Sequence, residues 1–137
     1  MTQFEGLSVD GKRCEASTGE TTAILNPATG EPIADVASAS PADIERAVQI
    51  GADRFEQGVW RRVSPRERRD VLRRIADLVR RDLEELAQLE SRNGGKPIAA
   101  ARGEIGGVAT TFDFYAGAVD KIHGQTIPGH ANGNLFT

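Results

Sequence analysis

A strongly amphipathic stretch between Ser64 and Arg92 is the feature that most constrains how this chain can fold. Ser64, Pro65 and Glu67 form a capping-box pattern, in which serine and glutamate satisfy free amides of a first helical turn. Apolar residues then recur at three- and four-residue spacing, which places them on one helical face. The members of this face are Leu72, Ile75, Ala76, Val79, Leu83 and Leu86. The pattern predicts one long helix, stopped by Asn93-Gly94-Gly95, where glycine can form a left-handed cap.

Short strands separated by turns are predicted before this helix. Asp10-Gly11 lies between the segments LSV and KRCEA, and Asp-Gly is a strong signal for a two-residue hairpin. A turn at Ser17–Glu20 precedes the β-branched segment TTAIL. Further turns at Asn26-Pro27 and Thr29-Gly30 precede PIADVA, the last expected strand, which ends near residue 37.

A second helix start signal lies at Ser40. Ser40 suits the N-cap, Pro41 suits the first helical position, and Asp43 can satisfy amides of the first turn. We expect this helix to stop near Gly58. Its apolar face consists of Ile44, Ala47, Val48, Gly51, Ala52 and Phe55.

A third helical stretch is expected after Pro97, with a break near Gly103. Its apolar stripe consists of Ile105, Val108, Ala109, Phe112, Tyr115, Ala116 and Val119. Phe114 and Ala118 lie off the stripe, and helices that are apolar around much of their circumference are usually buried on several sides. Interior glycines such as Gly106 cost about 1 kcal/mol each relative to alanine, which indicates that something approaches this surface closely.

The charge pattern argues against nucleic-acid and membrane partners. The net charge is -3 over 137 residues, which gives no overall attraction to polyanions. The arginines between Arg61 and Arg81 are interleaved with acidic residues at helical spacing, so a solvated, ion-paired face is expected in place of a phosphate-binding one. No segment has the length and hydrophobicity of a membrane span, and we expect a cytoplasmic protein.

Four candidate reactive groups favour ordinary structural roles. Cys14 is the only cysteine and lies in the expected hairpin, without a base nearby in sequence. His123 and His130 lack companions at zinc-ligand spacing. The segment NGGK at Asn93–Lys96 lacks the glycine spacing and following hydroxyl of a phosphate loop. We therefore assign no catalytic and no cofactor-binding residue to this chain.

Five segments, in order, resemble the aldehyde dehydrogenase superfamily. They are NPATGEPIADV, SPADIERAV, RRIADLVRRDLEELAQLES, NGGKPIAAARGE and FYAGAVDKIHGQTIP. The resemblance implies an α/β enzyme, of which this chain is the amino-terminal segment. Short antiparallel strands are followed by helices that would pack on a missing dinucleotide-binding sheet. Residues 1–125 would belong to the cofactor-binding domain, with helices over about 41–122, and residues 126–137 would begin the oligomerisation arm.

The resemblance implies oxidation of an aldehyde to a carboxylic acid with NAD or NADP. In the family, a cysteine thiolate attacks the aldehyde, hydride passes to the nicotinamide, and a glutamate-activated water hydrolyses the thioester. The equivalents of that cysteine and glutamate lie beyond Thr137. We therefore expect a truncated or separately encoded piece, inactive alone and binding no cofactor by itself. The complete enzyme would be a homo-oligomer.

The resemblance also suggests two sites. The carbonyl of Leu25 and the side chain of Asn93 match the positions that hold a monovalent cation in many members, with asparagine replacing a carboxylate. Gly103, Gly106 and Gly107 fall on the helix that borders the aldehyde tunnel, and their small size predicts a roomy entrance for bulky aldehydes.

Two alternatives stand beside the enzyme segment. One is a non-catalytic helical interaction module that would bind its partner through the exposed apolar face of the helix between Phe112 and Val119. The other is a nucleic-acid-binding helix, which the mixed charge disfavours. For the enzyme segment, we expect poor independent stability and pairing with a separately encoded remainder.

Overall fold

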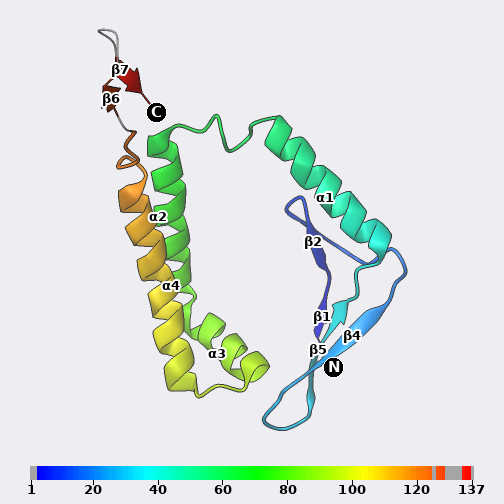
Figure 1. The fold of residues 1–137 in the computed structure, drawn as a ribbon. Coiled ribbons are helices and arrows are strands. Elements are labelled where there is room, and N and C mark those ends of the chain that lie inside the picture. Colours follow the sequence, from blue (N-terminus) through cyan, green and yellow to red (C-terminus); the bar gives the residue numbers. More distant parts are fainter. Residues whose placement is uncertain (1–2, 125, 129–133, 137) are drawn as a thin grey trace.

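A computed structural model of the protein describes residues 3–124, 126–128 and 134–136. Two bodies lie opposite one another in it, joined by residues 57–64 (Figure 1). The strand body consists of β1 (Gln3–Glu5), β2 (Leu7–Val9), β3 (Lys12–Cys14), β4 (Thr21–Leu25), β5 (Pro32–Ala37) and α1 (Pro41–Glu56). The helix body consists of α2 (Pro65–Arg81), α3 (Leu83–Gly94) and α4 (Ile98–Ala118). The hairpin of β6 (Thr126–Pro128) and β7 (Asn134–Phe136) extends beyond the helix body (Figure 1).

The predicted hairpin at Asp10-Gly11 is confirmed. Both turn residues have positive φ, 51° for Asp10 and 72° for Gly11, as a tight two-residue turn between twisted strands requires. β2 and β3 pair antiparallel, with Leu7 opposite Cys14.

A three-stranded sheet holds the remaining strands in the order β1-β5-β4. β4 and β5 pair antiparallel, as predicted, around the Asn26–Gly30 turn. β1 was not predicted, and it pairs parallel with β5 from Gln3 opposite Ala34 to Glu5 opposite Val36. A three-residue strand offers too few alternating positions to stand out in a sequence, and only its distant partner stabilises it.

α1 begins as the sequence predicts and is fastened to the β2–β3 side of the strand body. Ser40 and Asp43 form a reciprocal capping box, and Pro41 occupies the first helical position. At the other end of α1, Arg54 donates two hydrogen bonds to the carboxylate of Asp10 at 2.8 and 3.1 Å. Hydrogen bonds from Ser17 to Asp43 and from Arg54 to Asp10 therefore hold a helix whose apolar face is open.

The expectation of one unbroken helix from Ser64 to Arg92 was wrong. Its capping box and its end are correct, because Gly95 adopts a left-handed φ of 70° as the cap of α3. The chain breaks at Asp82, where φ is -100° and ψ is 16°. Aspartate is a poor residue for a helix interior, and the break turns α3 so that it packs against α4 (Figure 1).

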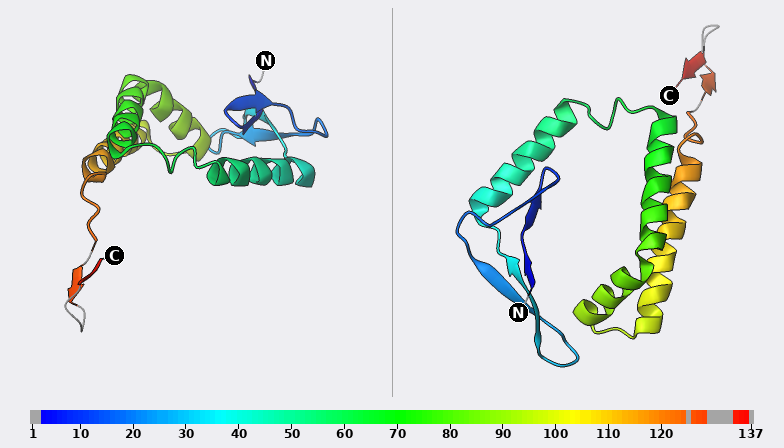
Figure 2. Two further views of the ribbon diagram at one scale, coloured as in Figure 1. Left: turned by 90° about the horizontal axis from the view of Figure 1, so that it is seen from above. Right: turned by 180° about the vertical axis from the view of Figure 1, so that it is seen from behind.

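The predicted break near Gly103 was also wrong, since α4 continues through that position to Ala118. α4 packs lengthwise against α2 and also contacts α3. Such tertiary packing outweighs the propensity cost of a few interior glycines. Figure 2 shows from two further directions that α2 and α4 run side by side.

The core among the described residues consists almost wholly of alanine. Ala76, Ala87 and Ala101 are fully buried, whereas no large side chain is buried to that degree in the described ranges. The predicted inner face of α2 and α3 is only half-buried apart from Ala76. Large side chains stay exposed in both bodies, including Phe55 at 69% and Phe114 at 70%. No helix in the described part of the chain could span a membrane.

Candidate functional site

The two predicted cation-site positions lie on segments that the fold brings together. Leu25 ends β4, and Asn93 lies in the last turn of α3. Two residues beyond each, Pro27 and Gly95 meet closely: a Cβ added to Gly95 would lie 2.7 Å from Cγ of Pro27. The β4–β5 turn therefore lies against the end of α3 and bridges the two bodies.

The chemistry available there is weak for a cation. A backbone carbonyl and a neutral amide are suitable oxygen donors for a hard ion, but neither carries charge. No group of three or more acidic, histidine or cysteine side chains that could hold a metal lies within the described residues. The nearby ammonium of Lys96 pairs with Glu90 and Glu104 at 2.7 and 2.5 Å.

The three predicted tunnel glycines lie along α4 with open space beside them. A Cβ added to Gly103, Gly106 or Gly107 would meet no heavy atom within 4 Å apart from its chain neighbours and the backbone of α4 itself. The sequence indicated that something approaches this surface closely, and no described residue does so at these three positions. The glycines therefore leave room on α4 that larger side chains would fill.

Cys14 has one neighbour that sequence reasoning missed. The guanidinium of Arg46 lies 3.8 Å from its Sγ, so a cation stands beside the thiol. The same guanidinium also contacts Asp43 at 3.3 Å, and Cys14 is half-buried in β3. His123 is exposed, and His130 lies outside the described residues. Within the described part of the chain, the polar side chain found against the Cys14 thiol is Arg46, which cannot act as a base.

Asp43 is the one buried charged residue among the described residues. It is 3% exposed and accepts hydrogen bonds from the amides of Ser17 and Ser40 at 3.0 and 3.1 Å and from both serine hydroxyls. These donors, led by the Ser17 amide, lower the pKa of Asp43 from 3.8 to about 2. A carboxylate enclosed by donors holds α1 to the turn before β4, and it is poorly suited to accept a proton.

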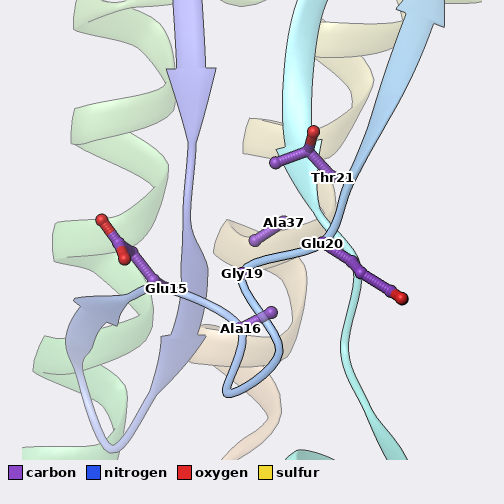
Figure 3. Close-up of a pocket in the computed structure, with 6 residues that line it drawn as sticks. All are labelled: Glu15, Ala16, Gly19, Glu20, Thr21 and Ala37. Carbon is purple, nitrogen blue, oxygen red and sulfur yellow. The ribbon is translucent and has the colours of Figure 1, made fainter.

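A small cavity lies next to this attachment, between the Ser17–Glu20 turn and β5 (Figure 3). Its volume is about 190 Å³, and its floor includes Ala16 and Ala37. The carboxylates of Glu15 and Glu20 point away from each other in Figure 3. The cavity therefore lacks the paired acid and base that hydrolytic chemistry needs.

An open groove of about 800 Å³ lies on the helix body, and we call it the Trp60 groove. Its lining residues are Trp60, Pro65, Arg68, Leu72, Tyr115, Ala118, Val119, Asp120 and Ile122. Arg68 stacks over the Trp60 ring at 5.7 Å and donates from Nη2 to the carbonyl of Arg61 at 2.7 Å. Its Nε is buried without a hydrogen-bond partner among the described residues.

The predicted ion pairing of the arginine-rich helix is present in part, at Arg69, Arg80 and Arg81. Arg80 pairs with Asp113 of α4 and with Asp77, and Arg81 pairs with Asp82. Arg102 of α4 donates two hydrogen bonds to Glu84 of α3 at 2.8 and 2.9 Å. Arg102 and Gln88 together lower the pKa of Glu84 to about 2. The pairs of Arg80 with Asp113 and of Arg102 with Glu84 therefore connect α4 to α2 and α3.

The described residues do not fit a dinucleotide. A dinucleotide site needs a glycine-rich turn between a strand and a helix, where backbone amides approach the pyrophosphate. The strand-to-helix connection from β5 to α1 runs through Ser38, Ala39 and Ser40, with no glycine. Ser40 and the first amides of α1 are already bonded within the capping box.

Comparison with known proteins gives a consistent result along the chain. The family model described as "Aldehyde dehydrogenase family" matches residues 14–137. Human retinal dehydrogenase 2 is 47% identical over 98% of this chain, which covers 26% of that protein. A mitochondrial aldehyde dehydrogenase of Arabidopsis thaliana, family 2 member B4, is 43% identical over 96% of this chain and 24% of its own length.

Solved structures agree with the sequence comparison. An NAD-dependent aldehyde dehydrogenase from Sinorhizobium meliloti superposes with a TM-score of 0.87 and 36% identity, over 97% of this chain and 26% of that one. A betaine aldehyde dehydrogenase from Staphylococcus aureus, solved in complex with NAD+, superposes with a TM-score of 0.88 and 29% identity, over 93% of this chain and 26% of that one. The expected fold class is confirmed, and the chain spans about a quarter of the length of these relatives.

Proposed function

Because the chain belongs to the aldehyde dehydrogenase family, we propose that it forms the amino-terminal segment of an enzyme that oxidises aldehydes with NAD or NADP. The carrying observation is the match along residues 14–137, supported by a relative 47% identical over 98% of the chain. Residues 1–125 would then belong to the cofactor-binding domain, and residues 126–137 would begin an arm used in a homo-oligomer in the cytoplasm.

In this proposal the segment positions the enzyme's chemistry and does not perform it. Its best-held charged groups, Asp43 and Glu84, are occupied by structural hydrogen bonds. Cys14 has a cationic neighbour but no base shown beside it. NAD or NADP would be bound by the remainder and would accept hydride there. Residues 1–137 alone would be inactive, whether the remainder continues the same chain or is encoded separately.

Two finer roles are proposed from the family resemblance. The carbonyl of Leu25 and the amide of Asn93 would hold a monovalent cation loosely, where the β4–β5 turn meets α3. Gly103, Gly106 and Gly107 would border the aldehyde entrance, and the open space beside all three supports a wide one. A relative named for retinal, a bulky aldehyde, is among the most similar proteins and supports the same substrate class.

The proposal is tested with a hybrid protein, in which residues 1–137 replace the matched segment of the S. meliloti enzyme. The hybrid should reduce NAD when an aldehyde is added, and the parent S. meliloti enzyme provides the control rate. A folded hybrid with no aldehyde-dependent reduction would contradict the proposal.

A non-catalytic interaction module is the second candidate, favoured by the exposure of Phe114 and Tyr115 on α4 at 70% and 59%. The downstream reading frame separates the two. A frame coding for a glycine-rich cofactor turn and a cysteine motif supports the enzyme, and an intact stop with its own regulation supports the module.

A further inference from the structure

We propose that the arginine-rich outer side of α2 is an interaction surface for a second copy of the protein, and that it binds the acidic side of that copy's α1. The inference goes beyond the proposed function, because it concerns the association of copies and not the reaction. Its starting point is the distribution of charge along the chain. Residues 57–81 contain nine arginines, no lysine and three carboxylates, which gives a net charge of +6 in a protein whose net charge is -3.

The positive charge of this stretch is only partly neutralised by its own carboxylates. Glu67 is bonded within the capping box of α2. Asp70 and Asp77 pair with arginines of the same helix. Within the described residues, five exposed arginines have neither an ion pair nor a side-chain hydrogen bond; they are Arg61, Arg62, Arg66, Arg73 and Arg74. These five side chains are therefore available to bind carboxylates of another molecule.

Two of these arginines lie on the side of α2 that faces away from its apolar stripe. Arg66 and Arg73 are separated by about two helical turns and so share one side, which we call the basic face. Ile75, a half-buried member of the apolar stripe, lies about half a turn away around the helix. Packing of the apolar stripe against other parts of an enzyme therefore leaves the basic face in solvent.

The strand body carries the opposite charge. The chain up to the end of α1 contains ten carboxylates and four lysines and arginines, a net charge of -6. On α1, the exposed residues Glu45, Asp53 and Glu56 recur at helical spacing and share one side, which we call the acidic face. The two arginines of α1 pair with Asp43 and Asp10, so the acidic face has no ion pair in the described part of the chain.

A second copy is the occupant that this charge distribution favours. Within one copy, α1 and α2 lie on opposite sides of the molecule (Figures 1 and 2), so the two faces can meet only between copies. Arginine forks match carboxylates in shape and charge. α2 has no aromatic side chain on which a nucleic-acid base could stack. Exposed ion pairs are individually weak and are screened by salt, so the contact should be weak and sensitive to salt.

Sedimentation velocity of the hybrid described above tests the contact, with the S. meliloti enzyme as background. At about 1 M salt the Debye length is about 3 Å, so charge contacts between copies are screened and only the enzyme's basal assembly remains. At about 0.01 M salt the Debye length is about 30 Å, and the weight-average mass of the hybrid should rise about twofold as its concentration increases. A hybrid whose mass does not depend on salt would overturn the proposal.

Charge reversal tests the two faces separately. Arg66→Glu combined with Arg73→Glu should hold the hybrid at its high-salt mass, because α2 then repels α1 of another copy. Glu45→Arg combined with Asp53→Arg should have the same effect from the other side. All four substitutions together restore the net charge and exchange the signs of the two faces, so association at low salt should return.

A matched control separates the two faces from net charge. Glu20→Arg combined with Glu31→Arg, on exposed turns, changes the net charge as much as the reversal on α1 does and should leave the association in place. Equal loss in this control, or no recovery with all four reversals, would mean that net charge and not face pairing drives association. Either result would overturn the proposal.

Aldehyde-dependent reduction of NAD, measured on the same samples, reports on the proposed function independently. An active hybrid that does not associate at low salt overturns the inference and leaves the function intact. An inactive hybrid whose association is lost and recovered as described supports the inference and contradicts the function. Binding of inorganic polyphosphate that requires Arg66 and Arg73, without self-association, would assign the basic face to a phosphate polymer and overturn the proposal.

Discussion

At the scale of single residues, the charged groups with the strongest pKa shifts serve structure. Asp43 is nearly enclosed by donors from Ser17 and Ser40, and Glu84 is held by Arg102 and Gln88. Both carboxyl pKa values fall to about 2, so both groups remain ionised through the whole physiological range. A general acid or base needs a pKa near the working pH. The electrostatics therefore support a packing role for this segment.

Asp43→Asn should lower the thermal midpoint of the active hybrid at neutral pH by several degrees and change its acid response. Because the folded-state pKa lies below the ordinary value, the contribution of Asp43 is complete above pH 3.8 and is lost as pH falls toward about 2. In melting curves recorded over a pH series, the hybrid with Asp43 should lose stability between pH 3.8 and about 2 more steeply than the Asp43→Asn variant. Parallel curves for the two proteins would contradict the assignment.

The glycines of α4 allow a second prediction at this scale. Gly107→Ala should stabilise the helix by up to about 1 kcal/mol, because it removes backbone freedom from a helix interior with open space beside it. Gly51→Ala in α1, also in open space, is the matched control for helix propensity. In the active hybrid, Gly107→Met should shift the ratio of kcat/KM values toward small aldehydes. If Gly107→Met left the selectivity between small and bulky aldehydes unchanged, Gly107 would not border the tunnel.

At the scale of elements, the contact between the β4–β5 turn and the end of α3 connects the two bodies. Its main parts are the left-handed cap at Gly95 and the ring of Pro27, which a Cβ at position 95 would meet at 2.7 Å. Gly30 has an almost equal φ of 74° but open space around it. Gly95 and Gly30 therefore form a matched pair: both have a left-handed φ, but only Gly95 lies against Pro27.

Gly30→Ala should cost about 1 kcal/mol, the usual penalty for a side chain in the left-handed region. Gly95→Ala should cost more, because the added methyl group must also displace Pro27. Combining Gly95→Ala with Pro27→Ala should remove most of the excess, as a double-mutant cycle by urea unfolding of the hybrid would show. Equal costs at the two glycines would mean that the turn does not press on α3 in solution.

The elements whose signals are local could be predicted from the sequence, and those that depend on distant partners could not. The Asp10-Gly11 turn and the caps at Ser40, Ser64 and Gly95 rest on chemistry within a few residues, and all four are present. The break at Asp82 was missed, because the apolar spacing from Val79 to Leu83 continues across it without interruption.

The residues of the candidate sites likewise fall into those that the sequence indicated and those that only the structure revealed. Local sequence identified Leu25, Asn93 and the glycines of α4 through a family resemblance, and their proposed roles stay predictions. The Arg46 neighbour of Cys14 and the unpaired Nε of Arg68 were missed, because each depends on segments whose approach no local pattern encodes. The exposed Trp60 beside an arginine-rich helix is the one sequence signal that could have led to the groove.

At the scale of the whole molecule, the described residues have a core of small side chains and leave large apolar ones exposed. Alanines fill the buried positions, and large side chains on α1, α4 and the connecting segment are exposed. Burial of large apolar side chains is the main favourable term in folding, worth about 1.5–3 kcal/mol for each one. A segment that leaves so many exposed gains much of its stability from whatever covers them.

Residues 1–137 alone should therefore unfold with low cooperativity and bind a hydrophobic dye. The hybrid should unfold in a single steep transition and bind much less dye, because its remainder covers the Trp60 groove and other open faces. Calorimetry and dye fluorescence of both proteins at equal concentration check this. A sharp, monomeric transition of the segment alone would show that its core is sufficient.

The central claim is that this segment supports an aldehyde dehydrogenase without holding its reaction centre. The most direct measurement is aldehyde-dependent reduction of NAD and NADP by pure residues 1–137, with the hybrid as positive control. We predict no rate above buffer for the segment and a clear rate for the hybrid. Saturable reduction by the segment alone, abolished by Cys14→Ser, would contradict the claim and place the chemistry on its only cysteine.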